Sequence, residues 1–402
     1  MKLIQIILFS LVVFGCTNSN KNKNLREENN NLIVIDQNFD KALEIAIESN
    51  KLLFIDFYTS WCAPCKKLDK LVFQNDSIRQ VLGGDFVLLK YDAENDTVFH
   101  LSKKHHVSGY PTGIVLNPTG HTINKKYSFS GNDFETLSRS VLEFTERSKE
   151  LNAQNKFLKG YSNTISAEKY PKFYVDFVER TNVRPDKNVI LNFINSKEDF
   201  FDEEDFSTLF YFANDVSSNA GDILLKDKQK YLDLYGELDV GQTLYKLVVG
   251  KFNDAISKNN QQDYDNAVVL MKNTLGEERA ANNLPRFELQ WLKAQNKWIK
   301  VFEIYEKRKV EGDMDDGGIN HICWDAYRNC DNQTVIAKCI EWMRDVTNKT
   351  PNYAYLDTYA FLLSKAGSKK LAIETAERGL KAAKEEGEDA KSLIKLIEKL
   401  RT

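Results

Sequence analysis

Two cysteines separated by two residues, Cys62 and Cys65, are the residues of this chain best placed to do chemistry. They belong to the motif Trp-Cys-Ala-Pro-Cys at residues 61–65, which follows an apolar run and opens a segment with a helical pattern. A helix N-terminus presents backbone N–H groups and the positive end of the helix dipole to the first sulfur, which lowers its pKa. We therefore expect Cys62 to be the nucleophilic thiolate and Cys65, one helical turn later, to resolve a mixed disulfide. Pro64 fits the first helical turn, where the N–H that it lacks has no helical partner to lose.

The same cysteine pair could instead be half of a zinc site or a structural disulfide. A zinc site normally needs a second pair of ligands at matching spacing. The one adjacent histidine pair, His105 and His106, has no cysteine beside it and follows two lysines, so we expect a solvated surface there. We therefore predict a redox dithiol with no metal and no cofactor.

Alternating strand and helix patterns around the motif predict an α/β domain over residues 34–148. Short apolar runs are typical of buried strands, and they fall at residues 52–58, 86–92 and 113–116. A turn signal at residues 117–120 leads into a fourth expected strand near 122–128. Helical patterns fall between and around these runs, at residues 39–47, from 66 onward, at 96–105 and at 133–148. Strands that alternate with helices in this way are typical of α/β domains, in which a sheet carries helices on its faces.

This predicted domain resembles the thioredoxin superfamily. Residues 61–65 are close to the Trp-Cys-Gly-Pro-Cys motif of that family. Asp56 stands six residues before Cys62, where thioredoxins carry a buried acid, and residues 110–112 match the family's cis-proline segment. Gly131 matches the glycine ahead of the last helix. The resemblance implies a thioredoxin fold and a thiol–disulfide oxidoreductase activity.

A second resemblance points to a particular group within the thioredoxin superfamily. The stretch at residues 66–77 is similar to the C-terminal domain of the DsbD electron transporter and to related stand-alone periplasmic thioredoxin-like proteins. Lys90 lies on the strand where thioredoxins place a lysine near the buried acid. Ala63 replaces the glycine that is common in the family, which would stiffen the loop between the cysteines.

The resemblance implies a proton-transfer role for Asp56. A carboxyl group desolvated behind the dithiol should have a raised pKa. It could then move a proton to or from Cys65 as that thiol attacks or leaves. The alternative is a structural carboxylate paired with Lys90.

The resemblance also implies a substrate-binding rim made of Trp61, Pro64, Tyr110 and Pro111. A cis bond before Pro111 would expose the backbone of Tyr110 beside the dithiol, so that a substrate peptide can add to it as a strand. Trp61 would offer an apolar platform at the same rim, or it serves packing alone.

The N-terminus has the features of a lipoprotein signal peptide over residues 1–15. Lys2 is followed by an apolar stretch too short to span a bilayer comfortably, and the segment ends in Val-Phe-Gly-Cys, which resembles a bacterial lipobox. Cys16 would then be the lipidated first residue of the mature chain, the alternatives being an uncleaved signal anchor or a soluble secreted protein. Residues 16–33 predict a flexible tether, because between residues 17 and 31 the one apolar residue is Leu25. We expect the protein in the cell envelope, facing the periplasm, with surface exposure as the open alternative.

Residues 149–402 lack strand patterns and predict an all-helical domain. A weak repeat of 32 to 33 residues near 320–385 resembles tetratricopeptide repeats, which form stacked helical hairpins. Small residues of the repeat (Ala360, Gly367, Ala372 and Ala376) would lie where paired helices touch. Such stacks commonly bind peptides or proteins, although a cap that only stabilises the first domain is the alternative.

Three further cysteines lie in the predicted helical domain. Cys339 occupies a small-residue position of the repeat and is expected to be a buried, inert thiol. Cys323 and Cys330 are seven residues apart, and a helix should end near Cys330. One disulfide among the three would be compatible with an oxidising compartment.

Composition excludes some classes of partner. The 402 residues carry a formal net charge of −3, which gives no electrostatic footprint for nucleic acid. We predict a lipid-anchored oxidoreductase that reduces or isomerises protein disulfides and receives electrons from a membrane donor, with a protein partner on the helical domain. The alternatives are a dithiol oxidant and a partner-binding scaffold without a redox role.

Overall fold

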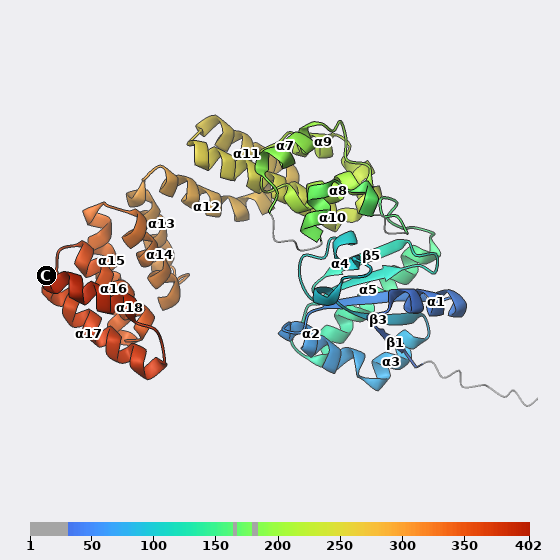
Figure 1. Ribbon diagram of the computed structural model, residues 1–402, viewed down its shortest axis with the longest axis horizontal. Helices are drawn as coiled ribbons and strands as arrows, with labels where there is room; N and C mark the ends of the chain where they lie inside the picture. The colour runs from blue at the N-terminus through green and yellow to red at the C-terminus, as the bar shows by residue number, and fades with distance from the viewer. Residues whose placement is uncertain (1–30, 164–166, 179–183) are drawn as a thin grey trace, which may run out of the picture. The chain divides into compact units, whose positions relative to one another are not determined.

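The computed structural model describes residues 31–163, 167–178 and 184–402 (Figure 1). Cys16, the predicted signal peptide and nearly all of the predicted tether lie outside these residues. The described residues form two compact units, residues 31–163 in the first and residues 167–178 and 184–402 in the second.

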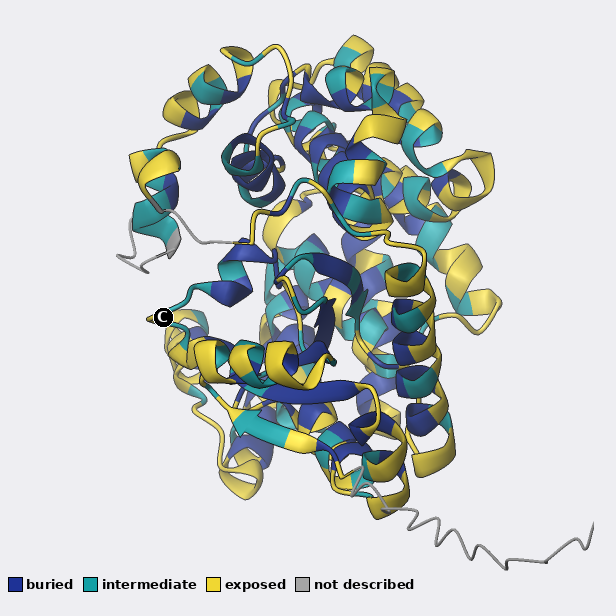
Figure 2. Ribbon diagram, turned by 90° about the vertical axis from the view of Figure 1, so that its right-hand side faces the viewer, coloured by how far each residue is buried: buried dark blue, intermediate teal, exposed yellow. Residues whose placement is uncertain are grey.

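The first unit is built on a five-stranded mixed sheet in the order β1-β3-β2-β4-β5. Strands β1, β3 and β2 are parallel, whereas β4 is antiparallel to β2 and to β5. The strands are β1 (Ile33–Asp36), β2 (Leu52–Tyr58), β3 (Phe86–Asp92), β4 (Thr112–Leu116) and β5 (Thr122–Tyr127). The central strand β2 is buried at six of its seven positions, as its continuous apolar run predicts (Figure 2).

Helices cover both faces of the sheet, so β2 contributes to two cores. Leu53, Ile55 and Phe57 pack with α1 (Phe39–Ser49) and α4 (Leu101–Lys104). Phe54 points the other way and packs with the second group of helices. These are α2 (Ala63–Leu68), the π-helical turn η1 (Asp69–Phe73), α3 (Asp76–Gly83) and α5 (Phe134–Ala153). By the same alternation, Asp56 faces the side of α2 and η1.

The predicted α/β class and thioredoxin fold are confirmed, but three details differ. Strand β1 was not predicted, because it has only four residues and is partly exposed on the edge of the sheet. The helix expected at 96–105 is only the four-residue α4, preceded by the 3-10 turn η2 (Ala93–Asn95). Asp96 accepts hydrogen bonds from the backbone N–H groups of Leu101 (3.1 Å) and Ser102 (2.7 Å), which fixes the start of α4 there.

The third difference is the end of the first unit. Helix α5 runs to Ala153 rather than to residue 148, and the chain then folds back onto the sheet. The backbone N–H of Leu158 donates to the carbonyl oxygen of Thr122 (2.8 Å), and Tyr161 is buried. Its ring lies 5.7 Å and 5.5 Å from those of His105 and His106, centroid to centroid. The prediction that this histidine pair is solvated was therefore wrong, since both histidines are buried.

The second unit is all-helical throughout its described residues, as predicted. It begins with the 3-10 turn η3 (Ala167–Lys169). Its helices are α6 (Lys172–Val178), α7 (Lys187–Asn195), α8 (Glu203–Phe212), α9 (Ala220–Lys226), α10 (Lys228–Lys258), α11 (Gln261–Leu275), α12 (Glu277–Ala294), α13 (Trp298–Val310), α14 (Asp316–Asn329), α15 (Gln333–Lys349), α16 (Tyr353–Lys365), α17 (Lys369–Glu386) and α18 (Lys391–Arg401). Gly236 has a positive φ of 79° inside α10, so that element is two helices joined at a kink.

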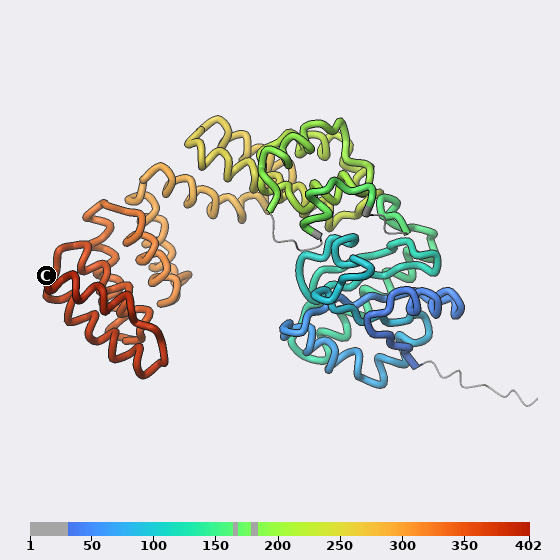
Figure 3. Tube along the Cα trace, in the orientation of Figure 1, coloured from blue at the N-terminus to red at the C-terminus, as the bar shows by residue number. Residues whose placement is uncertain are grey.

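The last helices of this unit run back and forth as paired elements (Figure 3). Helix α14 packs against α15 and α16, and α16 packs against α17. Ala360, Ala372 and Ala376 are fully buried, as expected for residues at helix contacts. Gly367 instead has a positive φ of 77° in the turn between α16 and α17, so its predicted place at a helix contact was wrong.

The three cysteines of the second unit are unbridged and buried in one apolar core. Helix α14 ends at Asn329 with Cys330 as its C-cap, as the sequence indicated. Burial raises the pKa of both Cys330 and Cys339 above the ordinary value of a thiol, which makes them poor nucleophiles. Over the described part of the chain, no helix is both long and apolar enough to cross a bilayer.

Candidate active site

The two cysteines of the motif lie at the end of β2, where the chain turns into α2. Cys62 is the N-cap residue of α2, and its Sγ accepts a hydrogen bond from the backbone N–H of Cys65 (3.2 Å). Pro64 lies in the first turn of that helix, where its missing N–H has no helical partner. The two sulfurs are joined as a disulfide, and both residues are buried. The predicted position of the first sulfur at a helix N-terminus is therefore confirmed.

Asp56 is a buried carboxyl group on the strand that leads into the motif. It pairs in register with Lys90 of β3 on one side and Gly113 of β4 on the other. The residue is 2% exposed, and its Oδ1 has no hydrogen-bond partner among the described residues. Burial raises the pKa of Asp56 to about 7, while Lys90 lowers that pKa and Asp69 raises it further. A group with this pKa exchanges protons readily near neutral pH.

Lys90 does not form its ion pair with Asp56. Its ammonium group pairs with Oδ1 of Asp69, the first residue of η1, and both side chains are partly buried. Oδ2 of Asp69 accepts a second hydrogen bond, from Gln74 (2.7 Å). The alternative of a structural Asp56–Lys90 pair was therefore wrong, because Lys90 forms its ion pair with Asp69 instead.

Sequence reasoning missed Asp69, although a signal was present. It lies seven residues after Cys62, which is two helical turns along the segment that α2 and η1 form together. Residues spaced in this way share one face of a helix, here the face toward the sheet. The carboxylate of Asp69 is thus brought toward the strands that carry Asp56 and Lys90.

Trp61 and Tyr110 lie together at the rim of the site. The indole of Trp61 is 66% exposed, and its ring meets that of Tyr110 edge-to-face at 6.1 Å between centroids. Its Nε1 donates to Oε1 of Glu94 (2.9 Å), a carboxylate that the sequence did not single out. The bond between Tyr110 and Pro111 is cis, as expected. The exposure of Trp61 favours the platform over a purely packing role.

Gly131 precedes α5, as the resemblance indicated. Its φ is +129°, and a Cβ placed there would lie 2.3 Å from the Thr136 hydroxyl oxygen. Asp133 then caps the helix by accepting a hydrogen bond from the backbone N–H of Thr136 (2.9 Å). Only glycine fits this entry into α5.

The described residues contain no group of three or more His, Cys, Asp or Glu side chains placed to hold a metal ion. The chemistry that this site offers is that of a dithiol and a buried carboxyl group.

Comparisons with known proteins point to the same domain. The thioredoxin-like family profile matches residues 34–118. A thioredoxin from Echinococcus granulosus is 35% identical over 97 residues, which is 22% of this chain and 81% of that protein. The thiol:disulfide interchange protein DsbD of Salmonella typhimurium is 36% identical over 78 residues, 19% of this chain and 14% of that protein.

Among solved structures, a thioredoxin from Thermus thermophilus is 16% identical with a TM-score of 0.27, covering 31% of this chain and 94% of that one. This chain therefore spans most of a thioredoxin but only a small part of the longer relative DsbD. Together with the disulfide at the end of β2, the family profile and the similarity in sequence to the thioredoxin give the family. Through its first unit, the chain belongs to the thioredoxin-like family of thiol–disulfide oxidoreductases.

Proposed function

We propose that this protein is a membrane-anchored oxidoreductase that reduces or isomerises protein disulfides in the periplasm. The observation that carries the proposal is the placement of Cys62 at the N-terminus of α2, with Cys65 one turn later and a carboxyl group of pKa about 7 on the adjoining strand. These three groups supply a nucleophile, a resolving thiol and a proton acceptor.

The reaction starts from the reduced dithiol. The thiolate of Cys62 attacks one sulfur of a substrate disulfide, and the other substrate sulfur leaves as a thiolate that takes up a proton. Asp56, as the carboxylate, accepts the proton of Cys65, and the new thiolate attacks Sγ of Cys62. The second substrate sulfur leaves as a thiolate and takes up the proton held by Asp56, and the Cys62–Cys65 disulfide seen in the structure remains. A donor protein then returns two electrons and two protons to the pair.

Substrate would bind along the rim beside Cys62. The exposed indole of Trp61 and the segment of Tyr110 and Pro111 support a peptide docked as an added strand against that segment. Glu94 holds the indole in place through its hydrogen bond to Nε1.

The anchor and the compartment rest on the N-terminal sequence. We propose that Cys16 is lipidated and that residues 16–33 tether the first unit to the membrane, where a membrane protein re-reduces the dithiol. Labelling with a radioactive fatty acid tests this: the label should be present in the wild type and absent in Cys16→Ser. Protease digestion of spheroplasts should degrade the wild type, and resistance in intact spheroplasts would contradict a periplasmic orientation.

The helical unit is proposed to recruit a partner through tetratricopeptide-like hairpins. The pairs α14/α15 and α16/α17 support this, as does the close contact of Gly379, where a Cβ would lie 3.4 Å from the Cβ of Leu356. Removing residues 166–402 should change which proteins are trapped by the redox site. An unchanged set would leave the unit without a role in partner choice.

Trapping tests the central proposal. In Cys65→Ser, a mixed disulfide through Cys62 should accumulate with substrate proteins in the native compartment, because the resolving thiol is gone. Cys62→Ser is the control and should trap nothing. The wild type should reduce insulin, and its reduction potential would separate a reductant from an oxidant. The proposal fails if no covalent partner is recovered and the wild type leaves insulin oxidised.

A further inference from the structure

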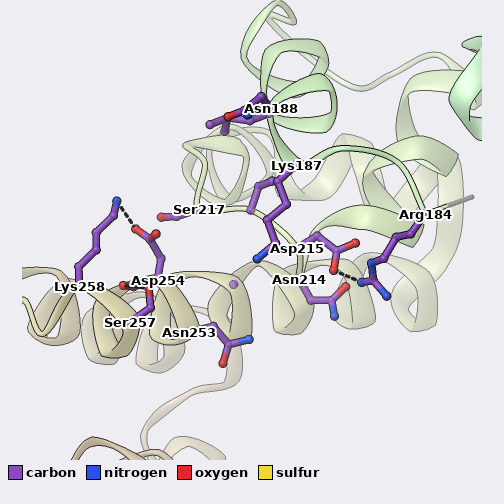
Figure 4. Close-up of a pocket in the computed structure, with 13 residues that line it drawn as sticks. Arg184, Lys187, Asn188, Asn214, Asp215, Ser217, Asn253, Asp254, Ser257 and Lys258 are labelled. Carbon is purple, nitrogen blue, oxygen red and sulfur yellow. Dashed lines mark hydrogen bonds and ion pairs between the residues drawn. The ribbon is translucent and has the colours of Figure 1, made fainter. Parts of the chain in front are cut away.

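The helical unit contains a polar cavity of about 540 Å³ that the redox chemistry does not use (Figure 4). It has three walls: the start of α7, the loop between α8 and α9, and the last turns of α10. Its volume falls in the range of ordinary ligand pockets. From its side chains we propose that this cavity binds an extended peptide segment through a single carboxylate.

The walls of the cavity are fixed by close contacts. A Cβ on Gly250 of α10 would lie 2.6 Å from the carbonyl oxygen of Val216 and 2.8 Å from that of Ala213, so helix and loop touch backbone to backbone. Arg184 pairs with Asp215 of the loop, whose carboxylate is mostly buried. The segment before α7 is thereby tied to the same loop, and the cavity is preformed.

Charge favours a ligand with one negative charge. Three basic and two acidic side chains line the cavity. Arg184 pairs with Asp215, and Lys258 of α10 pairs with Asp254 (2.8 Å). Lys187 extends into the space between these two pairs (Figure 4), and it has no ion pair or hydrogen bond to any described residue. The ammonium group of Lys187 is therefore left without a negative partner in the described part of the chain. The carboxylates of Asp215 and Asp254 would repel a doubly charged phosphate.

The uncharged side chains favour a peptide. Asn188, Asn214 and Asn253 each offer an amide that can donate and accept at once, which is the pattern that a peptide bond requires. Their side-chain amides make no hydrogen bond within the part of the chain that the structure describes. No aromatic ring is among the described residues that line the cavity, so a sugar would lack a stacking platform.

Fluorescence polarisation with labelled octapeptide pools tests the proposal on the full chain. The wild type should bind a random pool with a free C-terminus, and Lys187→Gln should weaken that binding at least about tenfold, because a charge-assisted hydrogen bond is lost. Asn253→Leu should also weaken it by removing an amide. Lys300→Gln is the matched control, since Lys300 is an exposed lysine on α13, outside the cavity.

Two further pools identify the source of the carboxylate. Loss of binding on C-terminal amidation indicates a chain terminus, whereas loss on omission of Asp and Glu indicates an acidic side chain, and either result supports the site. Absence of binding by every pool, or equal effects of Lys187→Gln and Lys300→Gln, overturns it. Displacement of the peptide by inorganic phosphate or by neutral oligosaccharides at equal concentration would assign the cavity to those ligands instead. Insulin reduction should be unchanged in Lys187→Gln, so failure here is separable from failure of the redox proposal.

Discussion

Replacing Asp56 by Asn should make the first unit more stable at alkaline pH and leave it little changed in acid. The carboxyl group is buried with a pKa of about 7, against 3.8 for an ordinary aspartate. Below about pH 3 it is mostly protonated in both the folded and the unfolded chain, so it favours neither. As the pH rises from 4 to 7, the unfolded chain loses this proton first, and the folded state loses stability relative to the unfolded state.

The magnitude follows from the difference between the two pKa values. That difference is about three pH units, and each unit corresponds to about 1.4 kcal/mol. The free energy of unfolding of the wild type should therefore fall by about 4 kcal/mol relative to Asp56→Asn between pH 4 and pH 8. Comparing the two proteins across pH removes any constant cost of placing an amide at this site.

Urea-dependent hydrogen exchange, read by mass spectrometry on peptides from β2 and β3, measures the stability of the first unit within the whole chain. Oxidised wild type and oxidised Asp56→Asn should give curves that diverge above pH 4 and become parallel above pH 8. Asp40→Asn, a change at an exposed aspartate on α1, is the control and should follow the wild type. Parallel curves for wild type and Asp56→Asn over the whole range would refute the assignment of a desolvated carboxyl group.

Three further predictions concern the electrostatics of the site, the free thiols and the entry into α5. Asp69→Asn should lower the pKa of Asp56 below 7, because it removes a negative charge and leaves Lys90 without its ion pair. The midpoint of the pH profile for resolving a mixed disulfide should therefore move to lower pH. Iodoacetamide should modify Cys62 in the reduced native protein, because the N-terminus of α2 favours its thiolate, and leave unmodified the three cysteines in the apolar core of the helical unit, as peptide mass spectrometry would show. Gly131→Ala should cost on the order of 2–3 kcal/mol, measured by the same exchange method.

Each of these predictions has a control. Lys90→Gln should move the midpoint of the pH profile for resolving a mixed disulfide to higher pH. A shift of Asp69→Asn and Lys90→Gln in the same direction would contradict the electrostatic explanation. Modification of the buried thiols should appear only after unfolding in urea, and equal labelling before and after would show that they are accessible. Gly109→Ala is matched to Gly131→Ala, because a Cβ at Gly109 has no atom within 4 Å, and the same loss from both would remove the steric explanation.

The central strands and the dithiol were predictable because single local signals determine them. Strand β2 is buried on both faces, so its sequence is a continuous apolar run, and the motif follows it directly. Strand β1 has no such signal, since it is short and partly exposed. The late start of α4, at residue 101 rather than 96, depends on one side chain, Asp96, that accepts hydrogen bonds from two backbone N–H groups and from the hydroxyl of Tyr91. Helix propensity alone does not reveal that a side chain accepts these backbone hydrogen bonds and so competes with the helix.

The partners of the site were harder to predict than its members. Cys62, Asp56 and Pro111 each stand at a characteristic distance from a recognisable element, and each lies where the sequence placed it. The choice of Lys90 between Asp56 and Asp69 depends on how η1 packs on the sheet, which is a tertiary property. Glu94 was missed for the same reason, because its hydrogen bond to the indole joins two loops far apart in sequence.

That choice of partner has a chemical consequence. A lysine paired directly with Asp56 would favour the carboxylate and lower its pKa toward the ordinary range, leaving a weak base. Because Asp69 neutralises Lys90, burial dominates at Asp56 and its pKa stays near 7. A base of this strength is largely ionised at slightly alkaline pH, and in the proposed reaction it would bind a proton firmly enough to take it from Cys65. In the proposed reaction, Asp69 would therefore set the basicity of Asp56 without taking up a proton itself, because Asp69 is the carboxyl group that pairs with Lys90.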